Sequence, residues 1–162
     1  MPPDGSTVVL FKDDTKKEVF LVFRSDYPIW GTTGGAIEKN ETPEEAALRE
    51  AYEETGFKTK ITKYCGTYQL TYNKLHLYEG RIISGKFKPE FPGCKGKWFN
   101  VNQLPKDMVT RTRREIIDAA NHQGKPFLKK GPMVNLKNDY LLALRHPLAF
   151  LKFFYNKLKN SL

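Results

Sequence analysis

The sequence has few of the residues that staple small secreted proteins or bind structural zinc. Its two cysteines, Cys65 and Cys94, form no CxxC pair, and its three histidines show no ligand spacing. Neither a disulfide framework nor a zinc site is indicated, and a reducing cytoplasm is the expected location. The chain also lacks an N-terminal basic segment followed by an apolar stretch, and lysines interrupt the apolar runs near its C-terminus. Export and a membrane span are therefore not expected.

Positive charge is the marked feature of the composition, with 27 Lys and Arg residues against 18 Asp and Glu residues. The resulting net charge of +9 favours polyanionic ligands, although it also serves solubility. The densest basic stretches, RTRRE from Arg111 and FLKKG from Phe127, have no interleaved aromatic residues that could stack on bases. We interpret each stretch as a solvated face in preference to a nucleic-acid contact.

Apolar patterning predicts a single α/β domain, because strand-like and helix-like stretches follow each other along the chain. The predicted strands are STVVLF from Ser6, VFLVFR from Val19, two stretches between residues 58 and 88, and KWFNV from Lys97. One predicted helix begins with Thr42 as its N-cap and Pro43 in its first turn, and it ends at Gly56. Another helix is predicted from Thr110 to His122.

The C-terminal part of the chain reads as an addition to this domain. A Gly/Pro/Lys-rich link around residues 124–132 leads to two helical stretches, YLLALRH from Tyr140 and PLAFLKFFYNKL from Pro147. We therefore predict a domain of residues 1–124 and a basic amphipathic helical extension of residues 125–162. Its apolar stripe of Phe150, Phe154 and Leu158 is expected to pack on the domain or on a second copy in a homodimer, in preference to a membrane surface.

Acidic residues gather in one segment of this basic chain. The segment from Gly35 to Phe57 contains seven of the eighteen carboxylates. Within it Glu50, Glu53 and Glu54 stand at i, i+3 and i+4, so they share one face of the predicted helix. Two such charges about 4 Å apart repel by roughly 4 kcal/mol at an effective dielectric constant near 20. Protonation or a hard divalent cation, Mg²⁺ or Mn²⁺, would relieve this repulsion.

A solvated acidic helix face is the alternative interpretation of these glutamates. Two features favour the metal site. The paired glycines Gly34 and Gly35 precede the helix and allow close approach of the backbone. The opposite helix face carries Ala47, Leu48 and Ala51, which are suited to packing on a sheet.

The same segment resembles the complete signature of the Nudix (MutT-like) hydrolases, G-x5-E-x7-R-E-U-x-E-E-x-G-U. Gly35, Glu41 and the run REAYEETGF from Arg49 match every fixed position, and the resemblance covers about residues 5–122. It implies an α/β/α sandwich around a mixed β-sheet. It also implies hydrolysis of the pyrophosphate linkage of a nucleoside diphosphate joined to another moiety, with Mg²⁺ or Mn²⁺ as cofactor.

The resemblance also implies roles for individual residues. Glu53 and Glu54 would be the principal metal ligands, Glu50 a further ligand or the group that deprotonates water, and the Gly34 carbonyl a backbone ligand. The candidate catalytic residues are Glu50, Glu53 and Arg49. Glu41 would fix Arg49 through a charge-assisted bond, and Arg49 would in turn hold the two glutamates.

Two positions depart from the pattern of many relatives. Thr33 replaces a proline before the paired glycines, which is expected to alter loop stiffness more than chemistry. Relatives often carry another glutamate shortly before the late-strand Trp98, but here the preceding residues are GCKGK. Glu90 or Glu79 could supply that general base, although each is equally interpreted as a surface carboxylate; otherwise Glu50 must act as the base.

We further predict substrate contacts for Arg24, Trp30 and Tyr72. Trp30 precedes the glycines and could stack on a base, although packing is an equal alternative. Tyr68 and Tyr72 lie about where some dinucleoside polyphosphate hydrolases of the family carry a tyrosine, and a core or edge-strand tyrosine is the alternative.

We therefore predict a metal-dependent pyrophosphohydrolase that acts on a nucleotide-type small molecule, and two alternatives stay open. One alternative is an RNA 5′-end pyrophosphohydrolase, which would use the basic surface as a track. The other alternative is a Nudix-fold binding or regulatory module without turnover.

Overall fold

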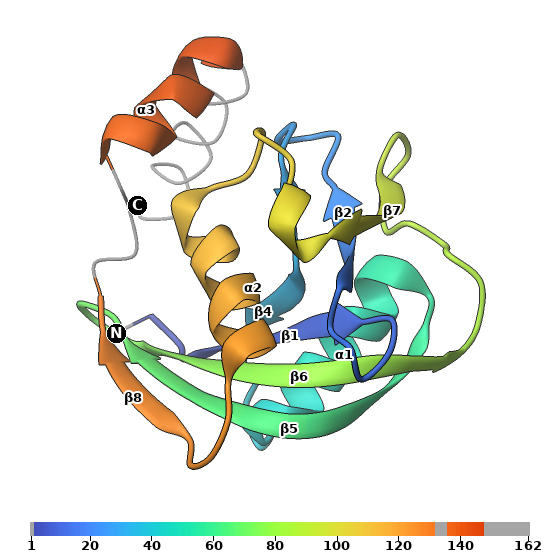
Figure 1. The fold of residues 1–162 in the computed structure, drawn as a ribbon, viewed down its shortest axis with the longest axis vertical. Coiled ribbons are helices and arrows are strands. Elements are labelled where there is room, and N and C mark those ends of the chain that lie inside the picture. The colour runs from blue at the N-terminus through green and yellow to red at the C-terminus, as the bar shows by residue number, and fades with distance from the viewer. Residues whose placement is uncertain (1, 132–135, 148–162) are drawn as a thin grey trace.

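A mixed β-sheet between helices forms the body of the protein, seen here in a computed structural model that describes residues 2–131 and 136–147 (Figure 1). In the described residues the strands are β1 Gly5–Phe11, β2 Glu18–Phe23, β3 Trp30–Gly31, β4 Thr33–Ala36, β5 Lys58–Gln69, β6 Lys74–Ser84, β7 Lys95–Asn100 and β8 Phe127–Lys130. The helices are α1 Pro43–Thr55, the 3₁₀ turn η1 Val101–Gln103, α2 Thr110–Asn121 and α3 Leu136–Arg145.

The sheet combines antiparallel and parallel pairs. Its order is β3-β2-β1-β6-β5-β8, with β4 also pairing with β1 and β7 with β2. β1 runs parallel to β6, and β5 runs parallel to β8, whereas the other pairs are antiparallel. A parallel pair requires a long crossover connection, and the segment between β1 and β6 includes α1. The predicted mixed sheet is thus confirmed.

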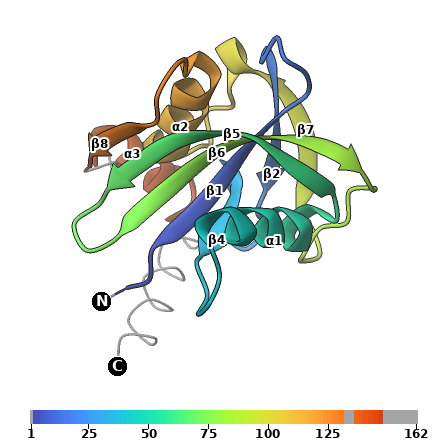
Figure 2. The same ribbon diagram turned by 90° about the horizontal axis from the view of Figure 1, so that it is seen from below.

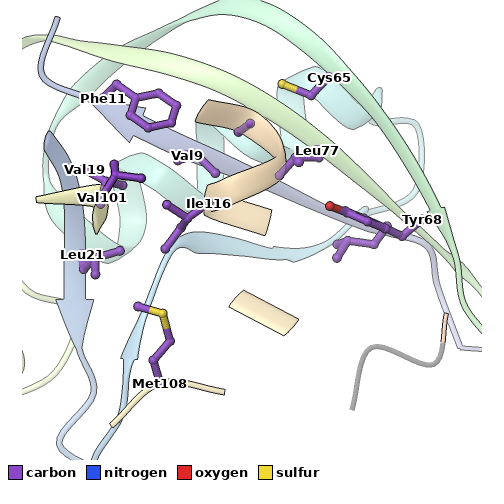
Figure 3. Packing of buried hydrophobic residues seen from close by; sticks show 12 residues of the cluster. Val9, Phe11, Val19, Leu21, Cys65, Tyr68, Leu77, Val101, Met108 and Ile116 are labelled. Atoms are coloured by element: carbon purple, nitrogen blue, oxygen red, sulfur yellow. The ribbon is translucent and has the colours of Figure 1, made fainter. Parts of the chain in front are cut away.

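Strand β1 is buried on both faces, and alternate residues feed two separate cores. Val9 and Phe11 pack in the core that also contains Ile116 of α2 (Figure 3). Val8 and Leu10 pack in the core that contains Ala47 and Ala51 of α1. Because successive strand residues point to opposite faces, α1 and α2 cover opposite sides of the sheet, as Figures 1 and 2 show together. This arrangement confirms the predicted sandwich.

Helix α1 begins and ends where the sequence predicts. Thr42 is the N-cap, and its side chain accepts a hydrogen bond from the backbone N–H of Glu45 at 3.2 Å. The Glu45 carboxylate accepts one in return from the N–H of Thr42 at 2.8 Å, which completes a capping box. Gly56 ends the helix with a φ of 72°, in the left-handed region that glycine adopts readily. These caps fix where the acidic residues of α1 lie against the sheet.

The predicted link after residue 124 contains a strand that the sequence analysis missed. β8 pairs with the edge strand β5, from Gly66 opposite Phe127 to Gln69 opposite Lys130. Phe127 packs on Tyr68 with ring centroids 5.1 Å apart. A strand of four residues carries little local signal, and its partner lies some sixty positions earlier in the sequence. Residues after 124 therefore contribute to the domain's own sheet.

Helix α3 contains part of the predicted stretch YLLALRH and contacts α2. The Asp139 carboxylate accepts hydrogen bonds from the backbone N–H and the hydroxyl of Thr110, at 2.9 and 3.0 Å. Leu142 is buried, and Arg145 lies 3.2 Å from Asp107. The predicted helix PLAFLKFFYNKL falls almost entirely outside the described residues. Within the described part of the chain, no helix has the length and apolar character needed to cross a bilayer.

Candidate active site

Arg49 is the centre of a partly buried ionic cluster between α1 and β4. Its Nε lies 2.9 Å from Glu41 Oε1, and its Nη2 lies 3.1 Å from Glu41 Oε2, which gives a two-pronged contact. Its Nη1 donates to Glu50 Oε1 at 2.8 Å and to Glu53 Oε2 at 3.1 Å. The Glu41–Arg49 contact that the family resemblance implies is therefore present. The hydrogen bonds that Arg49 donates to Glu41 are the largest cause of the raised pKa of Arg49, so this side chain stays positively charged.

The paired glycines bring the backbone of β4 against these acids. Strand β4 pairs with β1, with Gly34 opposite Thr7 and Gly35 opposite Ser6. A Cβ atom at Gly35 would overlap the carboxylate of Glu50. The N–H of Gly34 donates to Glu54 Oε2 at 3.3 Å. Close approach of the helix acids to this strand thus requires a residue without a side chain at position 35.

Glu54 has the most perturbed acid–base equilibrium of the helix acids. Burial and then the negative charge of Glu50 raise its pKa to about 8, against the opposing effects of Arg24 and of the Gly34 N–H. A carboxyl group in this position resists ionisation until a positive charge arrives. Perturbation by burial together with a specific charged neighbour is characteristic of functional sites.

The donor chemistry of this face suits a hard divalent cation. Glu50, Glu53 and Glu54 offer only oxygen atoms, and a cation would offset the burial and the repulsion by Glu50 that raise the pKa of Glu54. In the described residues, no three acidic, histidine or cysteine side chains are gathered into a ready-made metal cage. Instead Arg49 contacts Glu50 and Glu53, while Glu54 accepts a hydrogen bond from the N–H of Gly34. Binding a cation would therefore require these carboxylates to exchange partners.

The structure separates the two candidates for an additional base. Glu90 lies on the loop between β6 and β7 and lines a small cavity of about 30 Å³ together with Glu54 and Arg24. Glu79 lies on β6, is only 4% exposed, and pairs with Lys16 at 2.6 Å and with Arg81 at 3.5 Å. The geometry therefore brings Glu90, and not Glu79, beside an acid of α1.

The three predicted substrate contacts occupy different environments. Arg24 lines the same small cavity as Glu54 and pairs with Asp26 at 2.9 Å. Trp30 is partly buried and packs edge-to-face on Phe99, with centroids 4.7 Å apart. Tyr72 is 72% exposed at the turn between β5 and β6. Of the three, the structure brings only Arg24 to the acids of α1.

Tyr68 and Thr33, which the sequence analysis discussed, both have structural roles. Tyr68 is buried and donates a hydrogen bond to Asp118 at 2.5 Å, in agreement with its interpretation as a core tyrosine. Thr33 is buried in β4, and its carbonyl accepts a hydrogen bond from the Thr7 hydroxyl at 2.9 Å. The threonine that replaces proline thus takes part in packing between β4 and β1.

Glu115 is a candidate functional residue that the sequence analysis placed on a solvated face. It is 2% exposed, and it lines a cavity of about 270 Å³ beside Gly34 and Gly35. A usable signal was present, because Thr112, Glu115, Ile116 and Ala119 share the buried face of α2 at helical spacing. Because Glu115 ends the basic stretch RTRRE, that stretch was interpreted as solvated and the burial of Glu115 was not predicted.

The chain is similar in sequence to proteins named as a diphosphatase and as phosphohydrolases. The chain is 33% identical over 124 residues to the Bacillus subtilis (strain 168) protein named "Putative 8-oxo-dGTP diphosphatase", covering 75% of this chain and 82% of that protein. It is 39% identical over 79 residues to the mouse diphosphoinositol polyphosphate phosphohydrolase 3-alpha, covering 46% of this chain and 48% of that protein.

A solved structure supports the architecture independently. The NUDIX hydrolase from Nitrosomonas europaea superposes with a TM-score of 0.66 at 20% identity, covering 80% of this chain and 78% of that one. At this identity the likeness concerns the fold alone. The family model described as the NUDIX domain matches residues 1–120, a span that includes α1, the paired glycines and most of α2. The chain therefore belongs to the Nudix family of hydrolases.

Proposed function

We propose that this Nudix hydrolase cleaves the pyrophosphate linkage of a nucleotide-type small molecule with the help of Mg²⁺ or Mn²⁺. The observation that carries the proposal is the face of α1, where Glu50 and Glu54 lie against the glycines of β4 and Arg49 contacts both Glu50 and Glu53. Nucleotide chemistry is supported by the Bacillus subtilis relative, whose name refers to 8-oxo-dGTP and of which most of the length is matched. The mouse relative acts on diphosphoinositol polyphosphates by name, but this chain spans about half of it.

Glu50, Glu53 and Glu54 would hold the cation, with the Gly34 carbonyl as a backbone ligand. When bound there, the ion would neutralise phosphate charge and lower the pKa of a bound water. Arg49 positions Glu50 and Glu53 through its Nη1 group and is itself oriented by Glu41. Because Arg49 touches these ligands rather than the substrate, we propose that it is a positioning residue.

Glu90 is proposed to take the proton of the attacking water. As the water oxygen bonds to one phosphorus, the bridging P–O bond breaks and its electron pair leaves with the departing phosphate. The proton lost by the water passes to a carboxylate oxygen of Glu90, which lines the same cavity as Glu54. Arg24, at the same cavity, would offset the negative charge that builds on the phosphates.

A substrate screen tests this proposal. Nucleoside triphosphates, nucleotide sugars, dinucleoside polyphosphates, NADH, ADP-ribose and 5′-triphosphorylated RNA are each incubated with protein and Mg²⁺, and the products are separated and identified by anion-exchange chromatography, with released phosphate and pyrophosphate measured for the triphosphates. Turnover of small nucleotides above that of RNA supports the proposal. Preference for the RNA would assign the 5′-end activity instead, and binding without turnover would assign a regulatory module.

We propose that the protein is located in the cytoplasm. The two cysteines support this, because Cys65 and Cys94 are both free thiols. Burial is the largest cause that raises the pKa of Cys65 to about 11, so this thiol is held in its unreactive form.

A further inference from the structure

A polar cavity of about 270 Å³ lies between α2, the paired strands β1 and β4, and the turn from β5 to β6. Its wall includes Gly34 and Gly35, the same glycines that contact the acids of α1. A group bound there would thus lie next to the proposed site of cleavage. Sites for whole ligands usually measure about 300–1,000 Å³, so the cavity suits one ring of a substrate with the rest of the molecule outside.

Glu115 is the buried charge-bearing group of this cavity, and one of its oxygens lacks a hydrogen bond. Its Oε2 accepts a single hydrogen bond from the Thr32 hydroxyl at 3.3 Å. Its Oε1 is buried and has no hydrogen-bond partner among the described residues, although the Nε of Arg111 lies 3.3 Å away. A buried oxygen left without a donor costs free energy, which a ligand carrying donors would recover.

The neighbouring hydroxyl groups also favour a ligand with donors. The Thr7 hydroxyl donates to the Thr33 carbonyl at 2.9 Å, and the Thr32 hydroxyl donates to Glu115. The two hydroxyl oxygens also lie 3.3 Å from each other, so the available protons are shared among these acceptors and both oxygens keep lone pairs. An anionic group placed deep in this cavity would face a carboxylate and two acceptors, which disfavours a phosphate there.

Charge and apolar surface at other parts of the wall suggest how a substrate would be oriented. Arg111 is about half exposed and, with Lys74, supplies positive charge at the cavity. Leu70 and Leu75 supply apolar surface on which the face of a flat ring could pack. The ring edge would then meet Glu115, and phosphates would extend toward the cations and the acids of α1.

We propose that this cavity binds the base of the nucleotide substrate and that Glu115 selects bases with two adjacent N–H donors, as on the guanine edge. The inference rests on the proposed nucleotide function and adds a residue that determines specificity. Two parallel N–H groups match the two oxygens of one carboxylate, and such bidentate pairs give strong discrimination. Burial raises the pKa of Glu115, against the effects of Arg111 and Thr32, and N–H donors would favour its ionised form.

GTP and ITP provide a matched test, because they differ only in the 2-amino group of the base. The kcat/KM ratio of GTP to ITP is measured for the parent, for Glu115→Gln and for the control Asp118→Asn. Asp118 is an acid on the same helix that faces a different cavity. Both substrates are assayed on one preparation, so a partly unfolded variant does not change the ratio.

The parent and Asp118→Asn are expected to prefer GTP by roughly 10-fold or more, because a bidentate pair contributes that much discrimination. In Glu115→Gln the ratio is expected to fall close to one, since the amide cannot accept two hydrogen bonds from one edge. Equal turnover of GTP and ITP by the parent, or an unchanged ratio in Glu115→Gln, would overturn the inference while leaving the proposed hydrolysis intact.

Calorimetric titration with GDP and IDP separates failure of the inference from failure of the proposed function. If the parent hydrolyses no nucleotide but binds GDP more tightly than IDP through Glu115, the base site stands and the hydrolysis proposal fails. If neither nucleotide binds, both proposals fail. Tighter binding of a nucleotide sugar whose base lacks adjacent N–H donors would assign the cavity to a sugar instead.

Discussion

The carboxylate of Glu50 lies so close to Gly35 that a Cβ atom at the glycine would overlap it. This contact joins the two halves of the proposed site, the helix that carries the acids and the strand that faces the substrate. It also explains why the acids of α1 can lie against the backbone at all, since any side chain at position 35 would push Glu50 away.

Gly35→Ala is therefore expected to lower kcat by about 100-fold or more, because a displacement near 1 Å of a catalytic group has this effect. Unfolding by urea, followed by circular dichroism, should show a smaller change in stability than in activity. Equal activity of Gly35→Ala and the parent would contradict the placement of Glu50.

Glu90 and Glu79 should respond to substitution in opposite ways. Glu90→Gln is expected to lower kcat and to remove the acidic limb of its pH profile, since a base has been lost. Glu79→Gln is expected to keep the profile but to lose about 3 kcal/mol of stability, because it leaves Lys16 and Arg81 partly uncompensated. If neither variant alters the pH profile, the base must be Glu50.

The metal-free protein is expected to become less stable as the pH rises, through Glu115. Burial raises the pKa of this carboxyl above its ordinary value of 4.5, so the folded state binds more protons than the unfolded state above that pH. The contribution is fully present below pH 4.5 and is lost as the pH rises through the folded-state pKa. Urea unfolding from pH 4 to 8 should show a smaller decline in Glu115→Gln; an identical decline would contradict this assignment.

Two truncations test what the C-terminal residues contribute. A chain ending at Gly131 retains β8. A chain ending at His122 loses the ring contact between Phe127 and Tyr68 and the 2.6 Å ion pair between Lys129 and Asp118. The shorter chain should be less stable by about 2–3 kcal/mol, the effect of burying one large apolar side chain. Both should keep measurable turnover when folded, because the acids of α1 precede either end.

Size-exclusion chromatography of the same truncations tests association. Asp139, Leu142 and Arg145 of α3 contact the domain of the same chain, so the chain ending at Gly131 should expose their footprint. A change from dimer to monomer would show that the extension also joins two copies. Loss of all activity in a folded chain ending at Gly131 would show that the extension helps form the site.

The sequence predicted the elements whose signals are local. Thr42, Pro43 and Gly56 mark the ends of α1 because caps depend on a few neighbouring residues, and the spacing of the glutamates follows from the helix itself. β8 could not be predicted in this way, because a strand of four residues is specified by its pairing with β5. The environment of Glu115 likewise depends on Thr32 and the glycine strand, which are far away in sequence.

Metal-dependent hydrolysis of a nucleotide by parent, Glu53→Gln and Glu44→Gln tests the central claim most directly. Glu44 is an exposed acid in the first turn of the same helix and serves as the control for loss of one charge. Turnover of the best substrate is measured against Mg²⁺ concentration and in EDTA. We predict that turnover saturates with Mg²⁺, disappears in EDTA, falls by orders of magnitude in Glu53→Gln and changes little in Glu44→Gln. Full activity in EDTA, or undiminished activity of Glu53→Gln at saturating Mg²⁺, would contradict the assignment of the glutamates of α1 as the metal site.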